Sequence, residues 1–533
     1  MTRGTTAMVA NETESRDLVE QLVSVIGRDY VLTDDADREF YAMDVYSFRE
    51  LPIAVVQPGS LPDMVEISKI ATAAGVALVP RGGGASYTDA YLPDTPNSLL
   101  VDTERMNRIL EINEEDMYVT VEPGITWAEM TDALTAKGLR TPFWGPFSGI
   151  RATVGGSMSQ NSVSLGSGTF GISADSVLSF EVVLPGGGII RTGSNAIENG
   201  GPFFRWYGPD LTGLFTGDAG VLGLKARITL RLIKNPTHKM SCSFGFNDFD
   251  TMAEGAAAAA REGVASDNFG LDPKLQQGQL GSQDTGQMME AAKAVYKASR
   301  NPIEGLWKLI KMAIAGESML KAFPYSMHFN VEGYSRAEVG TKLNMIRKAV
   351  APHGKEIANT IPTVLMAMPF IPLYPILGPR GQRWVPMHGI MPFSRLQAFN
   401  ARLDELYEEY AERMDKHRVE KAAMFTSIST NGFLFEPVFY WEDDRTPFHK
   451  RYLPQEYLDM LPEYPANPEG RALVAEMKSR ILDIFSEFGA IHMQIGKSYP
   501  YMRGREENAE QLLRKIKDQL DPDGLMNPGG LGL

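Results

Sequence analysis

A run of three glycines follows an apolar segment in the first fifth of the chain. Residues 79–91 read V-P-R-G-G-G-A-S-Y-T-D-A-Y. Glycine adopts positive φ angles at low cost and lets the backbone approach a ligand closely. Successive peptides in such a loop turn several N–H groups toward one anion, while Arg81, Ser86 and Thr88 add a positive charge and two hydroxyl donors. These residues favour phosphate binding, and a tight turn between two strands is the alternative for a glycine run taken alone.

Two further glycine-rich stretches follow at intervals typical of a domain. The first consists of residues 145–149, G-P-F-S-G, together with residues 153–157, T-V-G-G-S. The second is residues 217–223, G-D-A-G-V-L-G. Three such loops in one chain predict a large cofactor that carries a pyrophosphate.

The pattern around the first loop predicts the elements that position it. Residues 55–58 read as a buried strand that ends at a proline, residues 63–74 have apolar positions at helical spacing, and residues 76–80 read as the next strand. A short helix over residues 16–27 precedes them. This β-α-β order with tight glycine turns predicts an α+β nucleotide-binding domain.

The composition changes between about residue 238 and about residue 490, which predicts a second α+β domain. Helical, mostly Met-containing stretches lie at 251–261, 286–322, 395–418 and 468–488. Apolar, strand-like runs lie between them at 324–332, 363–370 and 423–441. A last amphipathic helix is predicted over residues 507–519.

The overall composition is that of a globular protein of two or three domains, with 43% apolar and 22% charged residues. A formal charge of −14 argues against a nucleic-acid partner, since phosphate backbones need clustered Lys and Arg. The single cysteine, Cys242, excludes an internal disulfide and a Cys-based metal site. No stretch reaches the roughly 18 apolar residues of a membrane span, and the first 15 residues are polar. We therefore expect no membrane span and a cytoplasmic location.

Four further segments follow a definite order: residues 100–127 (with M-N-R-I-L-E-I-N and V-E-P-G), 180–193 (F-E-V-V-L-P-G-G-G-I-I-R-T-G), 204–223 and 520–530 (L-D-P-D-G-L-M-N-P-G-G). In this order they resemble the FAD-binding domain of the vanillyl-alcohol oxidase/p-cresol methylhydroxylase flavoprotein family. The resemblance is good over residues 50–235 and the last 15 or so residues, and much weaker between them. It implies an α+β fold with a two-subdomain FAD-binding domain (1–237), an α+β cap domain with an antiparallel sheet (238–500) and a C-terminal segment (501–533) that returns to the first domain.

The resemblance implies FAD as the cofactor, with its pyrophosphate bound by backbone N–H groups at 81–86 and 153–157. Non-covalent binding is favoured, and Ala85 excludes the histidine linkage that berberine-bridge-type relatives make at this position. The predicted cofactor-binding residues are Pro80, Arg81, Gly82, Gly83, Gly84, Ala85, Ser86, Tyr87, Pro146, Thr153, Gly155, Gly156, Ser157, Asn161, Gly220, Val221 and Asn527.

The catalytic candidates must orient a substrate and handle a proton while a hydride leaves for flavin N5. Tyr87 stands where the phenol-oxidising members place one of a tyrosine pair, and packing beneath the ADP moiety is the alternative. In residues 490–501, A-I-H-M-Q-I-G-K-S-Y-P-Y, the Tyr-Arg pair of those members is replaced by Ile491-His492. The Glu-His-Gly element of the hydroxyacid dehydrogenases is also absent. We predict His492 as the base or hydrogen-bond donor, with Tyr499 as the second choice and a structural role as the alternative.

His388, in W-V-P-M-H-G-I-M-P-F, lies near the position at which some relatives attach the flavin 8α-methyl group. Covalent attachment, an active-site role without a bond and a structural role remain open for it. The strand over 426–441 has none of the histidines with which hydroxyacid dehydrogenases hold a cation, and Asn431 with Glu436 is a poor cation site. We therefore predict no metal.

Aromatic side chains on this strand predict an apolar substrate pocket, while a core position for half of them is the alternative. The residues concerned are Phe433, Phe435, Phe439, Tyr440 and Trp441, together with Phe370 and Met366.

The sequence thus predicts an FAD-dependent oxidase or dehydrogenase of the 4-cresol dehydrogenase/vanillyl-alcohol oxidase branch. Its substrate would be an aromatic or hydrophobic alcohol or a para-substituted phenol, and its electron acceptor oxygen, a cytochrome or a quinone. A homodimer or higher homo-oligomer is expected. The alternatives are a D-2-hydroxyacid dehydrogenase of the lactate or glycolate type, a non-catalytic flavin-binding protein, and an NADPH-dependent reductase of the same fold.

Overall fold

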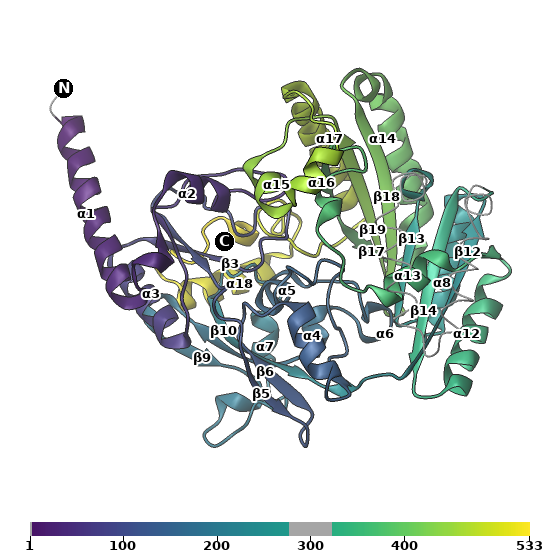
Figure 1. Cartoon of the computed structure of the whole chain (residues 1–533), viewed down its shortest axis with the longest axis horizontal. Helices are drawn as coiled ribbons and strands as arrows, with labels where there is room; N and C mark the ends of the chain where they lie inside the picture. Colours follow the sequence, from purple (N-terminus) through teal and green to yellow (C-terminus); the bar gives the residue numbers. More distant parts are fainter. Residues whose placement is uncertain (1–2, 277–321) are drawn as a thin grey trace.

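The computed structural model of the chain describes residues 3–276 and 322–533. In Figure 1 the first domain lies on the left and the cap domain, with its long sheet and flanking helices, on the right. The candidate site lies where loops of the first domain meet one face of the cap sheet.

Parallel strands carry the first glycine loop. Strands β2, β4 and β3 are parallel neighbours, and β1 pairs with β2 in the antiparallel sense. Their bounds are β1 (Val31–Leu32), β2 (Ala54–Val56), β3 (Ala77–Arg81) and β4 (Ser98–Asp102). The glycine loop therefore begins where β3 ends, at the carboxyl edge of a parallel sheet, which is where α/β proteins commonly bind nucleotides.

Two helices cover this sheet. α3 (Leu61–Ala73) lies where the helix over 63–74 was predicted, and its N-cap Ser60 accepts a hydrogen bond from the backbone N–H of Asp63. α1 (Arg3–Ile26) is longer than the predicted 16–27, because residues 3–15 continue the helix. Leu18 and Leu22 are buried in the core that α1 shares with α3.

A five-stranded antiparallel sheet completes the first domain. Its strands, in spatial order, are β5 (Ile109–Asn113), β6 (Tyr118–Val121), β10 (Leu224–Arg231), β8 (Val177–Val183) and β9 (Ile189–Arg191). Trp127, at the start of α4 (Trp127–Thr135), is fully buried in the core beside this sheet. The second and third glycine segments connect elements of this half of the domain.

The cap domain is built on an eight-stranded antiparallel sheet. The strands run in the order β15 (Lys355–Ile357), β12 (His238–Phe246), β14 (Tyr325–Gly333), β13 (Asp267–Leu271), β18 (Val419–Ile428), β19 (Gly432–Trp441) and β16 (Arg383–Pro386), with β17 (Gly389–Met391) also paired to β19. The helices that pack on one face are α8 (Phe249–Arg261), α12 (Arg336–Val350), α14 (Leu396–Lys416) and α17 (Pro468–Glu487).

Most of the predicted cap elements are confirmed. The stretches at 251–261, 395–418 and 468–488 are helices, and the run at 324–332 forms β14. The run at 423–441, predicted as one strand, is two antiparallel strands, the second half of β18 and all of β19, joined by a turn at 429–431. The run at 363–370 was wrongly predicted as a strand: it falls on helix α13 (Thr360–Ala367) and the turn after it. A short apolar run does not distinguish a buried strand from a buried helix, and Pro362 fits the first turn of a helix. The helix predicted over 286–322 falls almost wholly outside the described residues.

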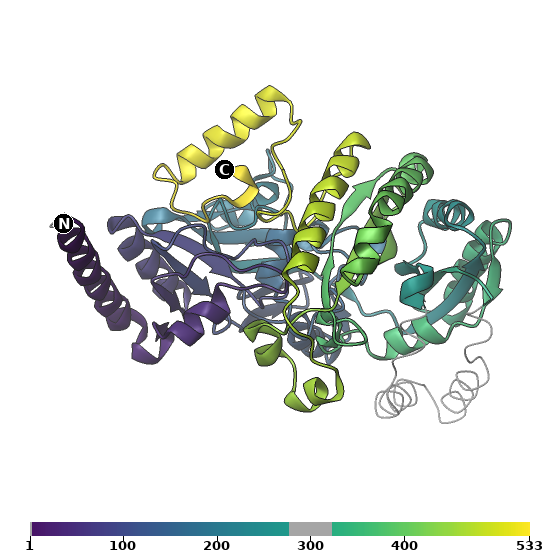
Figure 2. The same cartoon turned by 90° about the horizontal axis from the view of Figure 1, so that it is seen from above.

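The C-terminal segment folds back onto the first domain (Figure 2). The helix predicted over 507–519 is α18 (Glu507–Leu520). The buried ammonium of Lys517 donates to the backbone carbonyls of Val221 and Met526, both at 2.8 Å. The backbone N–H of Leu78, in β3, donates to the carbonyl of Leu525 at 2.8 Å. The segment after the cap therefore completes the sheet that carries the glycine loop.

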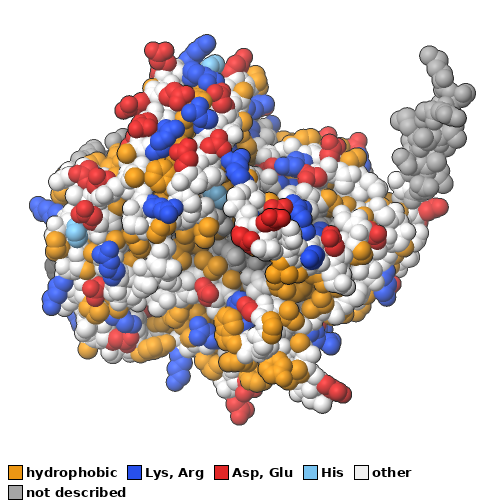
Figure 3. Space-filling view, turned by 180° about the vertical axis from the view of Figure 1, so that it is seen from behind, with side chains coloured by type: hydrophobic (Ala, Val, Ile, Leu, Met, Phe, Trp, Pro, Cys, Tyr) orange, Lys and Arg blue, Asp and Glu red, His pale blue; other side chains and the backbone are white. Residues whose placement is uncertain are grey.

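The surface carries charges of both signs. In the view of Figure 3, acidic and basic side chains are interspersed over both domains, and hydrophobic side chains gather in the lower half of that face. Among the residues that the structure describes, no helix is long and apolar enough to cross a membrane.

Candidate functional site

The first glycine loop presents unused backbone donors. Within the described part of the chain, the N–H groups of residues 83–88 donate no hydrogen bond. The carbonyl oxygens of Gly84 and Ser86 are occupied, since both lie near the hydroxyl of Tyr91, at 2.9 and 3.1 Å. Such a row of free N–H groups is what binding an anionic oxygen requires.

The second glycine segment lies against the first. Thr153 caps the short helix α5 (Val154–Gln160) by accepting from the N–H of Gly156 at 3.2 Å. A Cβ placed on Gly82 would lie 2.4 Å from the hydroxyl oxygen of Thr153, so the two segments touch. A Cβ on Gly156 would meet nothing else within 4 Å besides that hydroxyl, so this residue borders open space. Asn161, which ends α5 with a φ of 53°, keeps its buried Oδ1 without a partner in the described chain.

The third glycine segment and the C-terminal segment close the same region. Gly220, at a φ of +75°, lies so close to Pro80 that a Cβ there would be 2.4 Å from the proline ring. The side-chain amide of Asn527 donates to the carbonyls of Ala90 and Ala219, at 2.8 and 2.7 Å. The predicted cofactor residues Pro80, Gly220 and Asn527 therefore lie together. The side-chain amide of Asn527 donates its hydrogen bonds to backbone carbonyls of the protein.

These features fit a dinucleotide with a pyrophosphate. The free N–H groups lie at the end of a parallel strand, and Arg81, which is 2% exposed, keeps Nε and Nη1 without a partner among the described residues. A buried cation with two unused donors is suited to an anionic group.

The four predicted catalytic residues lie in one cluster, although up to 412 positions separate Tyr87 from Tyr499. His388 lies between β16 and β17, with its Nε2 2.6 Å from the hydroxyl of Tyr87 and its Nδ1 3.2 Å from the hydroxyl of Tyr499. The hydroxyl of Tyr499 also accepts from the backbone N–H of His388 at 2.7 Å. The ring of His492 stacks on that of Tyr499, with 4.3 Å between the centroids. That these residues are catalytic stays a prediction.

The protonation of the two imidazoles follows from their surroundings. Burial lowers the pKa of His388, which has no exposed surface, to about 3, so its ring is neutral. Burial also lowers the pKa of His492. The Nδ1 of His492 lies 2.6 Å from the backbone carbonyl of His388, and because a carbonyl only accepts, Nδ1 carries the proton. The Nε2 of neutral His492 therefore keeps a lone pair that can accept a proton.

Glu436, which the sequence suggested only as part of a poor cation site, belongs to this cluster. In the β19 ladder, Phe435 pairs with Gly389 and Val438 with Pro386, so Glu436 lies across from His388. Directly opposite residues on antiparallel strands share a face of the sheet. Burial raises the pKa of Glu436 to about 8, and its charge would raise the pKa of both Tyr87 and Tyr499. No ion pair or hydrogen bond of its carboxyl group occurs in the described chain, so the group is a neutral acid at pH 7.

The signal that identifies Glu436 was present in the sequence. Strand residues alternate between faces, so the aromatic residues at 433, 435, 439 and 441 share one face and Glu436 lies on the other. The expectation that this strand lines a substrate pocket is wrong for Phe433, Phe435, Phe439 and Trp441, which are 0–1% exposed in the core with the cap helices. On the even-numbered face, Leu434 packs with Val163 of the first domain, so this face is turned toward that domain near Glu436.

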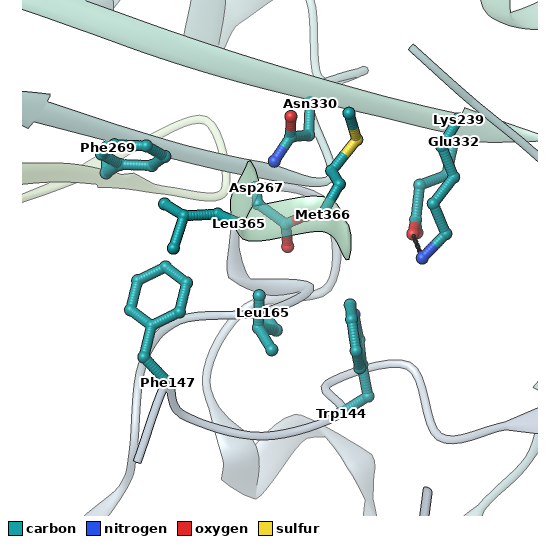
Figure 4. Close-up of a pocket in the computed structure, with 10 residues that line it drawn as sticks. All are labelled: Trp144, Phe147, Leu165, Lys239, Asp267, Phe269, Asn330, Glu332, Leu365 and Met366. Carbon is teal, nitrogen blue, oxygen red and sulfur yellow. Dashed lines mark ion pairs between the residues drawn. The ribbon is translucent and has the colours of Figure 1, made fainter. Parts of the chain in front are cut away.

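A crevice between the domains opens at the other half of the cap sheet (Figure 4). Trp144, Phe147 and Leu165 come from the first domain, and Leu365 and Met366 from α13. Its remaining lining residues belong to β12, β13 and β14: Lys239, Asp267, Phe269, Asn330 and Glu332. The predicted pocket therefore does not form as one site: Met366 lines this crevice, but none of the aromatic residues of β19 does. The ring of Phe370 packs against Trp144 with 5.9 Å between centroids. The crevice combines apolar side chains with the charged groups of Asp267 and of the ion pair between Lys239 and Glu332, whose atoms lie 2.9 Å apart. The buried indole N–H of Trp144 is unpaired within the described residues.

Metal ligands do not converge anywhere in the described part of the chain. No group of three or more His, Cys, Asp or Glu side chains is placed there to hold an ion. Asn431, in the turn between β18 and β19, and Glu436 do not form such a group.

Comparison with protein families identifies the first domain. Residues 52–193 match the family model of the FAD binding domain. This part of the chain is an FAD-binding domain, and FAD is its cofactor. The match spans β2 to the end of β9 and includes the first two glycine segments, as the sequence predicted.

Curated relatives resemble about half of the chain. Glycolate oxidase subunit GlcD of Bacillus subtilis is 33% identical over 241 residues, which are 45% of this chain and 50% of that protein. The mitochondrial D-lactate dehydrogenase [cytochrome] of Arabidopsis thaliana is 32% identical over 252 residues, which are 47% of this chain and 42% of that protein. The chain thus spans about half the length of the curated relatives that it matches.

Solved structures resemble the whole fold. p-Cresol methylhydroxylase with substrate bound superposes with a TM-score of 0.72 at 17% identity, over 98% of this chain and 97% of that one. The 4-ethylphenol oxidase from Gulosibacter chungangensis gives a TM-score of 0.67 at 17% identity over the same shares. The predicted α+β fold, with a p-cresol methylhydroxylase-type FAD-binding domain and an antiparallel cap sheet, is confirmed. The two sequence relatives described above, in contrast, carry the names of enzymes of glycolate and D-lactate.

Proposed function

We propose that this protein is an FAD-dependent oxidoreductase that oxidises an aromatic or hydrophobic alcohol, or a para-substituted phenol. The observation that carries the proposal is the buried cluster of two tyrosine hydroxyls and two neutral imidazoles around His388. In the described chain no Lys or Arg donates a hydrogen bond to any of these four side chains. Such a site suits an uncharged hydroxyl group better than a carboxylate.

The side chains of the cluster have complementary tasks in this reaction. The chemistry that bound FAD supplies is removal of a hydride from carbon. As the carbon loses its hydride, the substrate hydroxyl must release or share its proton. His492 Nε2 offers a lone pair for that proton. The neutral ring of His388 accepts from one of the two tyrosine hydroxyls, so the other hydroxyl can stabilise the oxygen by hydrogen bonding. Glu436, neutral near pH 7, adds no negative charge that would oppose an anionic oxygen.

A D-2-hydroxyacid is the second candidate substrate, and two observations favour it. Two curated relatives, which match 45% and 47% of the chain, are named for glycolate and D-lactate. The ammonium of Lys478, on α17, lies 3.7 Å from the ring centroid of Tyr46 with no ion pair in the described chain. Burial and the neighbouring His492 lower the pKa of His388 most, and the charge of Lys478 lowers it further. A cation on this side of the cluster would suit a carboxylate substrate.

A substrate panel separates the two candidates. Anaerobic bleaching of the flavin absorbance is measured with 4-alkylphenols, aryl alcohols, D-lactate, glycolate and 2-hydroxyglutarate. Rapid bleaching by a phenol or an aryl alcohol is expected. Rapid bleaching by D-lactate with none by the aromatic compounds would overturn the proposal in favour of the hydroxyacid. A flavin spectrum that no member of either group bleaches would favour a non-catalytic flavoprotein.

The remaining properties stay predictions from the sequence. The electron acceptor is proposed to be oxygen, a cytochrome or a quinone, and the protein to be a cytoplasmic homodimer or higher homo-oligomer. Covalent attachment through His388 is tested by acid precipitation, because a covalently bound flavin stays with the pellet. Both ring nitrogens of His388 contact tyrosine hydroxyls, which supports non-covalent binding.

A further inference from the structure

One side chain of the cap domain reaches the glycine loop of the first domain. Tyr452 ends helix α15 (Pro447–Tyr452), which packs beside α2 (Asp35–Tyr41) near the end of β3 in Figure 1. The rings of Phe40 and Phe448 confirm that contact, with 6.1 Å between their centroids. The link between the cap and the loop is therefore a packed interface and not a lone side chain.

The hydroxyl of Tyr452 makes three hydrogen bonds at the loop. It accepts from Nη2 of Arg81 at 2.9 Å and from Nη2 of Arg151 at 3.2 Å. It donates to the carbonyl oxygen of Gly83 at 3.2 Å. A phenol has one donor and two acceptor positions, so this arrangement uses its full capacity. Arg151 Nε donates to the same carbonyl at 3.0 Å, which holds the Gly83 peptide from a second direction.

Fixing a carbonyl also fixes the N–H of the next residue. In a planar trans peptide the N–H points away from the C=O. The Gly83 carbonyl is held by Tyr452 and Arg151, so the N–H of Gly84 is turned to the opposite side. The carbonyls of Gly84 and Ser86 share the single hydroxyl proton of Tyr91, and their orientation sets that of the N–H groups of Ala85 and Tyr87 in the same manner. These are among the N–H groups that donate no hydrogen bond in the described chain.

The cation at the centre of this arrangement is itself held rigidly. The guanidinium carbon of Arg81 lies 5.1, 4.5 and 5.1 Å from the ring centroids of Phe40, Tyr41 and Tyr91. Cation–π contacts of this kind stabilise a desolvated cation. Arg81 therefore offers Tyr452 a fixed partner.

We propose that Tyr452 is a positioning residue for the cofactor: the cap domain orients the peptide at Gly83 and so makes the affinity for FAD depend on the packing of the cap. The inference rests on the proposed placement of the FAD pyrophosphate at the glycine loop and is independent of the substrate. It assigns a role in cofactor retention to a residue in α15, outside the family match at 52–193.

The test compares two tyrosines that each donate to a backbone carbonyl. Tyr452→Phe removes only the hydroxyl at the loop. Tyr334→Phe is the matched control, because the Tyr334 hydroxyl donates to the carbonyl of Lys234 at 2.9 Å, away from the loop. FAD dissociation from the holoprotein is followed by the rise in flavin fluorescence on dilution. If the flavin is covalently bound, both variants are made in a His388→Ala background.

We expect Tyr452→Phe to weaken FAD binding about tenfold, since its hydroxyl bonds two charged donors and the carbonyl, and Tyr334→Phe to leave it unchanged. Binding of ADP to the apoprotein should weaken by the same factor, because ADP carries the pyrophosphate without the flavin. The melting temperature of the Tyr452→Phe apoprotein should stay close to that of the wild type. Arg151→Lys, which loses Nε as a donor, should weaken FAD in the same direction, and the double variant should show less than the sum of the two free-energy losses.

Three results would overturn the proposal, and they differ in meaning. Unchanged dissociation constants for FAD and ADP in Tyr452→Phe, with FAD lost from Gly83→Val, would leave the pyrophosphate at the loop and remove the role of Tyr452. Full FAD retention in both variants would show that the pyrophosphate binds elsewhere. An equal loss of apoprotein stability and FAD affinity would reduce Tyr452 to a structural contact.

Discussion

The glycine loop and the His388 cluster solve different problems with different parts of the chain. The loop offers backbone N–H groups, and its side chains matter because Tyr91, Tyr452 and Arg151 fix the direction of the peptides. The cluster offers side chains whose burial sets their protonation. Cofactor binding here depends on local backbone shape, whereas the chemistry depends on residues that only the complete fold brings together.

The largest expected effect is loss of FAD when the loop cannot keep its shape. A Cβ at Gly83 would lie 1.8 Å from the carbonyl oxygen of Arg151, so Gly83→Val must displace the loop from the second glycine segment. Gly156→Val should also lose FAD, because the valine side chain would occupy the open space beside the loop in which we place the pyrophosphate. The ratio of flavin to protein absorbance measures the loss, and near-complete loss is expected for Gly83→Val.

Gly340→Val is the matched control for both variants. Gly340 lies in α12, and a Cβ there meets nothing within 4 Å. Normal flavin loading of Gly83→Val and Gly156→Val would contradict the placement of the pyrophosphate.

The next prediction concerns a substitution in the His388 cluster that leaves the glycine loop unchanged. His492→Ala removes the predicted proton acceptor, so flavin reduction by substrate should slow by at least about a hundredfold. Flavin content should stay near normal. His238→Ala and His417→Ala should change little, because neither histidine contacts the cluster in the described chain. Anaerobic stopped-flow absorbance measures the rate of flavin reduction by substrate. A rate in His492→Ala close to that of the wild type would contradict His492 as the base and make His388 the next candidate.

Glu436 makes the stability of the cluster depend on pH. Its pKa is raised from 4.5 to about 8, so between these values the folded protein keeps a proton that the unfolded chain has released. The free energy of unfolding should therefore fall as pH rises from about 5 to about 8, by a few kcal/mol at most. Glu436→Gln should remove this slope, so the variant gains stability over the wild type at pH 9 and not at pH 5. Identical pH profiles of the melting temperature would refute a neutral buried Glu436.

The smallest effect concerns Tyr87, the residue shared by both regions. Its backbone belongs to the glycine loop, and its hydroxyl lies 2.6 Å from His388. Tyr87→Phe keeps the N–H and loses the hydroxyl, so FAD content should be unchanged while flavin reduction slows roughly tenfold, as expected for one or two lost hydrogen bonds. Loss of FAD with an unchanged reduction rate in the remaining holoprotein would place Tyr87 beneath the ADP moiety instead.

Much of the loop could be predicted from the sequence, and less of the cluster. The glycines at 82–84, the flanking strand and α3 are local features, so composition and periodicity identified them. The sequence predicts each of the four cluster residues separately, yet nothing in it shows that His388 lies between Tyr87 and Tyr499. Their contact depends on the pairing of β17 with β19, which has no local signal.

Two errors have the same physical origin. On sequence alone, Glu436 is not placed in the His388 cluster, because the aromatic residues around it are assigned to a substrate pocket. Strand alternation instead places Phe433, Phe435, Phe439 and Trp441 in the core. The apolar residues of α13 were assigned to a strand because a short apolar run is ambiguous. In both cases the face that an element buries was decided by its tertiary neighbours.

The return of the C-terminal segment has a consequence for how the protein is made. Lys517 and Asn527 contact the third glycine segment and the end of the first loop, and Leu525 pairs with β3. During translation, every strand of the cap sheet is synthesised before these residues. During synthesis the cap can therefore fold while the dinucleotide domain still lacks its last contacts, and FAD is expected to be captured after translation has passed Asn527.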